Sequence, residues 1–145
     1  MTDRLKGFLL YVLPLILYCT GIFILSSAPL PELPDFGFDF QDKLNHIVAY
    51  GLMTLLAYRA ATWIGRDMEW SRGKPIALAV LFVAFYGVSD EFHQMYVPGR
   101  SSEIYDWLAD VAGALLAIPA LHYLSRTRLA YQVKKEQAEH QETLH

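Results

Sequence analysis

Residues 89–100, SDEFHQMYVPGR, place two acids, a histidine, a glutamine and an arginine directly behind an apolar run. A histidine beside a carboxylate can act as a general base or a nucleophile, and arginine binds phosphate and carboxylate groups. Ionisable residues also gather at 42–46 and 106–110, each at the start of another apolar run. Together these residue types could bind and act on an anionic ligand, provided that the fold brings them together.

The elements that must position these residues are predicted from the spacing of charges. Residues 7–31 contain no Asp, Glu, Lys or Arg, which is enough helix to cross a hydrocarbon core of about 30 Å. Three shorter charge-free runs, 44–58, 75–89 and 111–125, span only if they draw in flanking polar residues. Soluble helices would need polar faces, and IALAVLFVAFYGV at 76–88 has almost none. The prediction is an all-α integral membrane bundle of four transmembrane helices at about 7–29, 43–64, 75–95 and 104–124.

The first run has an alternative interpretation as a signal peptide. Arg4 and Lys6 precede it, and SSA at 26–28 resembles a cleavage site. Its apolar part is longer than the usual ~7–15 residues of a signal peptide, which favours a retained span.

Composition excludes several other classes of protein. The chain is 54% hydrophobic, which is too apolar for a disordered protein. Its net charge of −3 lacks the excess of basic residues that a nucleic-acid binder needs. The single cysteine, Cys19, has no intrachain partner for a disulfide. Phosphate-binding loops, GxSxG and HExxH motifs are absent from the sequence.

Basic residues predict the orientation. The N-terminal segment, the middle connection with the end of the second span, and the C-terminal tail hold ten Lys and Arg, whereas the other two connections hold only Lys43 and Arg100. The positive-inside rule then places both termini in the cytoplasm and the loops at about 27–42 and 96–103 outside. Residues 1–125 would form the membrane domain and 126–145 a short polar cytoplasmic tail.

In this topology the polar residues of spans two to four converge in the outer leaflet. A bare charge in hydrocarbon costs roughly 2.5–3.5 kcal/mol, so these groups must pair with one another or face a water-filled pocket. The candidate catalytic residues are His46, Asp90, His93 and Asp106. The candidate substrate-binding residues are Lys43, Glu91, Gln94, Arg100 and Asp110. Structural pairing of the acids with the two basic residues is the alternative.

Helical spacing assigns some of these residues to faces. Asp90, His93 and Gln94 share one face of the third span, whereas Glu91 lies about 100° round the helix. The VPGR tetrapeptide predicts a tight turn that holds Arg100 above the mouth between spans three and four.

One face of the fourth span carries polar residues at its outer end and small residues further towards the cytoplasm. Asp106, Asp110 and Gly113 follow helical spacing along it. Small residues let helices approach closely in lipid, so this face is expected to pack inward.

DKLNHIVAYGL (42–52), followed by SDEFHQMYVPGRSSEIYDWLADVAGALLA (89–117), resembles the VanZ-like family of small bacterial membrane proteins. The matching positions are Asp42, Lys43, His46, Asp90, Glu91, His93, Gln94, Arg100, Asp106 and Gly113. Asp110 departs from the family pattern, which usually has Asn there; an amide cannot ionise, so an obligatory catalytic base is not expected at this position. The resemblance implies a bacterial cytoplasmic membrane, an envelope role and, through the founding member, a link to resistance to the glycopeptide teicoplanin.

Three functions remain open at this stage. One is a hydrolase or transferase acting on a phosphate- or carboxylate-bearing lipid. In it His46 or His93 would be the base or nucleophile, and Asp90 or Asp106 would orient the imidazole. The others are a non-catalytic binding or shielding protein of the cell envelope, and a proton-coupled transporter.

The expected partners are the lipid bilayer and either a lipid-linked anionic envelope component or a glycopeptide; nucleic acid is not among them. The mixed nitrogen and oxygen ligands would suit a divalent metal, although no spacing is diagnostic of one. The oligomeric state is open.

Overall fold

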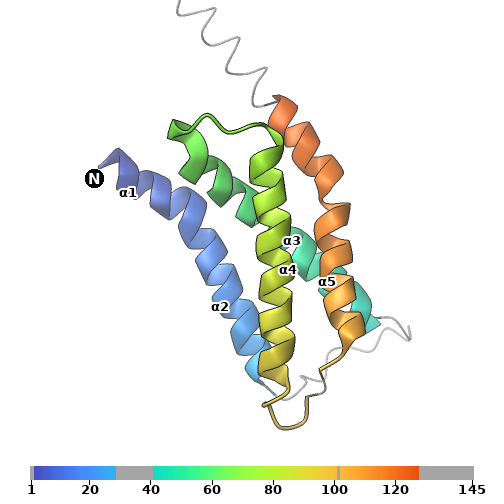
Figure 1. Ribbon diagram of the computed structural model, residues 1–145. Helices are drawn as coiled ribbons and strands as arrows, with labels where there is room; N and C mark the ends of the chain where they lie inside the picture. The colour runs from blue at the N-terminus through green and yellow to red at the C-terminus, as the bar shows by residue number, and fades with distance from the viewer. Residues whose placement is uncertain (1, 29–40, 101, 128–145) are drawn as a thin grey trace, which may run out of the picture.

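The computed structural model describes residues 2–28, 41–100 and 102–127, and this part of the chain contains helices and no strand. The described helices form four rods, which lie alongside one another (Figure 1). The first rod is built from α1 (Asp3–Gly7), the π-helical η1 (Phe8–Val12) and α2 (Leu13–Ser27). The others are α3 (Gln41–Ile64) with the short η2 (Gly65–Asp67), then α4 (Gly73–Gln94), and finally α5 (Ile104–Leu116) continued by 118–127.

All four rods are long and apolar enough to cross a membrane. The predicted all-α class with four spans is therefore confirmed. Asp90 and Glu91 lie within α4, and Asp106 and Asp110 lie within α5. This agrees with the prediction that the short apolar runs extend into flanking polar residues to reach the length of a span. Of the outer loop expected at about 27–42 and the tail expected at 126–145, residues 29–40 and 128–145 lie outside the described residues.

The first rod changes its helical geometry just before Pro14. Proline has no N–H to bond the carbonyl four residues earlier, which frees the carbonyl oxygen of Leu10. The guanidinium of Arg59 on α3 donates to that oxygen over 3.3 Å and lies 5.7 Å from the ring centroid of Tyr11. This contact ties the first rod to the end of α3 that lies away from the polar residues.

Helices α3 and α5 cross with their backbones in contact. A Cβ on Gly51 would lie 3.3 Å from the carbonyl oxygen of Gly113, and a Cβ on Gly113 would collide with the carbonyl of Ile47. The inward-packing small face predicted for the fourth span is thus observed. The adjoining core is formed by side chains from α3, α4 and the fourth rod: Tyr50, Met53, Val83 and Ala114 in one cluster, and Ala57, Tyr58, Ile76, Ala79 and Leu121 in the other.

Candidate functional site

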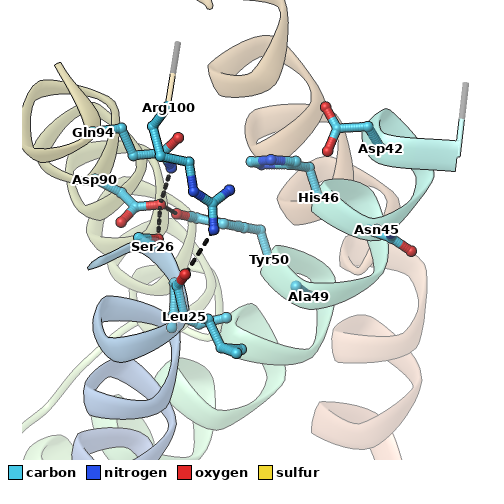
Figure 2. Close-up of a pocket in the computed structure, with 11 residues that line it drawn as sticks. Leu25, Ser26, Asp42, Asn45, His46, Ala49, Tyr50, Asp90, Gln94 and Arg100 are labelled. Atoms are coloured by element: carbon cyan, nitrogen blue, oxygen red, sulfur yellow. Dashed lines mark hydrogen bonds between the residues drawn. The ribbon is translucent and has the colours of Figure 1, made fainter. Parts of the chain in front are cut away.

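A cavity of about 190 Å³ lies at the end of the bundle where α2 and α4 finish and α3 begins (Figure 2). Helix α3 supplies one continuous face of it, at positions 42, 45, 46, 49 and 50, which follow helical spacing. The lining residues are Ile22, Leu25, Ser26, Asp42, Asn45, His46, Ala49, Tyr50, Asp90, Gln94 and Arg100. The wall is therefore apolar at Ile22, Leu25 and Ala49 and polar elsewhere.

His46 joins this cavity to the acids of α5. Its ring lines the cavity, and its Nδ1 lies 2.8 Å from Oδ1 of Asp110, a side chain with 0% exposure. Within the described residues Nε2 has no hydrogen-bond partner, so it is the ring atom left to meet a ligand. The carboxylate that orients His46 is thus Asp110, and not Asp90 or Asp106 as the sequence analysis expects.

The direction of α3 and α5 explains why Asp110 takes this place. Both helices start at the polar end and run the same way, so their residues pair in parallel register. Lys43 faces Asp106, and His46 faces Asp110 one turn further along. The close crossing at Gly113 brings the second of these pairs within hydrogen-bond distance.

Asp90 joins three helices through a single oxygen. Its Oδ2 accepts hydrogen bonds from Ser26 Oγ at 2.9 Å, Tyr50 Oη at 3.0 Å and Gln94 Nε2 at 3.0 Å. These donors come from α2, α3 and α4 respectively. Asp90 is therefore a structural centre of the polar end as well as part of the cavity wall, and Gln94 serves it from one turn further along the helix.

Lys43 is surrounded by carboxylates. Its ammonium donates to Asp106, to Glu103 over 3.0 Å and to Asp42 over 3.2 Å. Asp106 is 5% exposed, so the ammonium neutralises a buried acid. Its positive charge is shared among these acids, which leaves little of it for a substrate anion.

Arg100 closes the cavity from the turn that follows α4. Gly99 has φ +81°, the left-handed conformation that the VPGR turn predicts. The Arg100 guanidinium donates from Nε to the carbonyl of Ala28 over 3.0 Å, and from Nη2 to that of Leu25 over 2.7 Å. A cation at the last carbonyls of a helix is favourable, so Arg100 also caps α2. Figure 2 shows the guanidinium reaching into the space between Asp90 and His46.

Two predicted site residues on α4 do not line the cavity. Glu91 Oε2 accepts hydrogen bonds from Ser102 Oγ at 3.1 Å and from the Glu103 N–H at 2.9 Å, which anchors the start of α5. His93 turns towards α2, with Nε2 2.9 Å from Ser27 Oγ and its ring 4.5 Å from that of Phe23. Neither of the two lines the cavity, although Asp90 and Gln94 on the same helix do.

Four polar residues of the cavity are not among the predicted site residues: Ser26, Asp42, Asn45 and Tyr50. Asn45 and Tyr50 belong to the helical face that carries Asp42 and His46, and this spacing could have revealed them. Ser26 lies near the end of its helix at the depth of the other polar groups. Ser26 could therefore have been predicted only from the order and direction of the helices in the membrane.

The fold and the site define a multi-pass membrane protein with a polar cavity at one end of a four-helix bundle. Comparison with known proteins identifies the family: a VanZ/LLP1 model matches residues 23–125, and the chain belongs to this family. It is also 26% identical over 124 residues to uncharacterized protein C11E3.10 of Schizosaccharomyces pombe, covering 85% of this chain and 72% of that protein. No solved structure matches the chain.

Proposed function

We propose that the protein binds the anionic headgroup of a membrane lipid or lipid-linked envelope component in this cavity and acts on it as a hydrolase or transferase. The observation that carries the proposal is the position of His46. Its ring lines the cavity, while the buried carboxylate of Asp110 engages the opposite nitrogen. An imidazole held in this way presents Nε2 in a set direction for proton exchange with a bound ligand.

The shape and lining of the cavity support a lipid ligand. Ile22, Leu25 and Ala49 give it an apolar side that suits the start of an acyl or prenyl chain. Arg100 projects into its polar side, and its Nη1 makes no hydrogen bond to the described residues. That nitrogen is placed to donate to a phosphate or carboxylate oxygen.

The sidedness follows from the distribution of basic residues. The polar end carries Lys43 and Arg100, whereas the opposite connection and both termini carry the other ten Lys and Arg. In a bacterial cytoplasmic membrane this bias orients the cavity towards the extracytoplasmic side. Substrates would then enter from the outer leaflet.

A lipid-profile experiment tests the proposal. Cells lacking the protein are compared with cells that make the unaltered chain, His46→Ala, or the control His122→Ala, which alters an exposed histidine on the fourth rod. The expected result is that one lipid or lipid-linked cell-wall precursor changes in the deletion and with His46→Ala, and returns to normal with His122→Ala. An unchanged profile in the deletion, or full complementation by His46→Ala, would refute an enzymatic role.

Non-catalytic binding is the second candidate, and the involvement of Arg100 and Asp90 in structural hydrogen bonds favours it. A shielding protein of this kind could underlie glycopeptide resistance of the teicoplanin type. The two candidates differ in one outcome: a shielding protein leaves the lipid profile unchanged and still protects cells from the drug.

A further inference from the structure

Behind the cavity, His46 meets two acids that come from two other helices. One nitrogen of His46 on α3, one oxygen of Glu91 on α4 and one oxygen of Asp110 on α5 all lie within 4.8 Å of one another. The two acids are 7% and 0% exposed. Three helices therefore present one nitrogen and two carboxylates to a single small volume.

The two acids each keep an oxygen without a hydrogen-bond partner among the described residues. These atoms are Oε1 of Glu91 and Oδ2 of Asp110. The second is directed at α4, since a Cβ on Gly87 would lie 2.8 Å from it. Because Gly87 precedes Glu91 by one helical turn, Asp110 reaches the same face of α4 that carries Glu91. A buried polar atom without a partner is rare and calls for a proton, a water molecule or a bound ion.

The nearby lysine and arginine do not neutralise this pair. Lys43 donates to Asp42, Glu103 and Asp106, and the guanidinium of Arg100 donates to backbone carbonyls of the first rod. Within the described residues neither Glu91 nor Asp110 forms a salt bridge with Lys or Arg, and His46, when protonated, offers one positive charge to two acids. Two buried carboxylates in a membrane-spanning bundle require a further proton or a cation.

We infer that His46, Glu91 and Asp110 form a binding site for a divalent first-row transition-metal cation, of the Mn²⁺ or Zn²⁺ type. One imidazole with two carboxylates is a ligand set that such ions accept, with positions left for water or a substrate oxygen. The neighbouring group of Asp42, His46 and Asp106 is a weaker candidate, because the ammonium of Lys43 already bonds to Asp106.

The cation would supply what the cavity lacks for an anionic headgroup. Asp42 and Asp90 line the cavity against one permanent cation, Arg100, and an ion beside His46 would add positive charge at the cavity wall. The existence of the metal site is independent of the proposed function, whereas its use in holding a phosphate or carboxylate rests on that function. With the cation bound, His46 would serve as its ligand and not as the group that exchanges a proton.

Metal content tests the inference directly. Full-length protein in lipid nanodiscs is stripped with a chelator, titrated with Mn²⁺ or Zn²⁺ alone, and its bound metal is measured by mass spectrometry. We expect one equivalent to bind, and Glu91→Gln to weaken binding by at least about tenfold. The matched control is Glu103→Gln, which removes a carboxylate that bonds to Lys43, and should bind like the unaltered protein. No bound ion in the unaltered protein, or equal binding by Glu91→Gln, would overturn the site.

A second measurement needs no variant and so does not depend on whether Glu91→Gln folds. X-ray absorption at the zinc edge of the loaded, unaltered protein should show an imidazole among oxygen ligands, and a coordination sphere of oxygen alone would contradict the assignment. The lipid-profile result separates this inference from the proposed function. If metal binds and the lipid profile is unchanged, the metal site is supported and the proposed function is rejected. If the lipid profile changes and no metal binds, the proposed function is supported and the metal site is rejected.

Discussion

At one end of the bundle, α3, α4 and the fourth rod pack through small and apolar side chains such as Ala57, Ala79 and Leu121. At the other end, the same three rods meet through carboxylates, an imidazole and an ammonium. Lipid is as apolar as the side chains of the first end, so burial from water cannot drive helix association there, and close packing must do so. The polar end is held by directed contacts in which each group needs a particular partner. A change of shape should therefore damage the first end, whereas a change of chemistry should damage the second.

The largest expected effect comes from the crossing that both ends share. Gly113→Ala puts a methyl group against the backbone carbonyl of Ile47, which cannot move aside as a side chain can. We expect a loss of about 3 kcal/mol in the free energy of unfolding in detergent. Gly21→Ala is the control, because a Cβ there meets nothing within 4 Å. Equal stability of the two variants would show that α3 and α5 are not in backbone contact.

At the polar end, Asp90→Ala removes the acceptor for Ser26, Tyr50 and Gln94 together. The expected loss is about 2 kcal/mol, because buried donors are left unsatisfied. Asp90→Asn keeps an oxygen in place and should lose less than half of that in the same unfolding assay. If the alanine variant is as stable as the asparagine variant, Asp90 does not hold the three helices together.

In the apolar core between the two ends, Val83→Ala opens a small void beside Met53 and Ala114, at a position with 0% exposure. The expected loss is about 1 kcal/mol, since the packing contacts are lost while transfer into lipid contributes little. Phe85→Ala on the lipid-facing side, where the ring is 72% exposed, should change the unfolding free energy by less than about 0.5 kcal/mol. A larger effect at Phe85 than at Val83 would mean that the assignment of inward and outward faces is wrong.

The two ends also differ in how far the sequence predicts them. Charge-free runs predict four helices, because the hydrocarbon thickness sets a minimum length for each span. Convergence of the acids and histidines at one end follows from topology, and the face holding Asp90 and Gln94 follows from helical spacing. These inferences depend only on positions along single helices.

Pairing between helices could not be predicted in the same way. That His46 meets Asp110, while Lys43 takes Asp106, depends on the parallel register and close crossing of α3 and α5. The turn of His93 towards Ser27 depends on where α2 ends. Each of these contacts is set by the relative placement of two helices, which no single-helix pattern contains.

The central claim is that the polar end encloses a water-filled cavity open to the outside of the cell. Reaction of a membrane-impermeant maleimide with Asn45→Cys in a Cys19→Ser background tests it, since Asn45 lines the cavity and the chain has no other cysteine. We predict labelling of this residue in intact cells, and labelling of Ser71→Cys, an exposed position in the connection between η2 and α4 at the opposite end of the bundle, only after lysis. If Asn45→Cys reacts only in lysed cells, or does not react at all, the cavity does not open where the account places it.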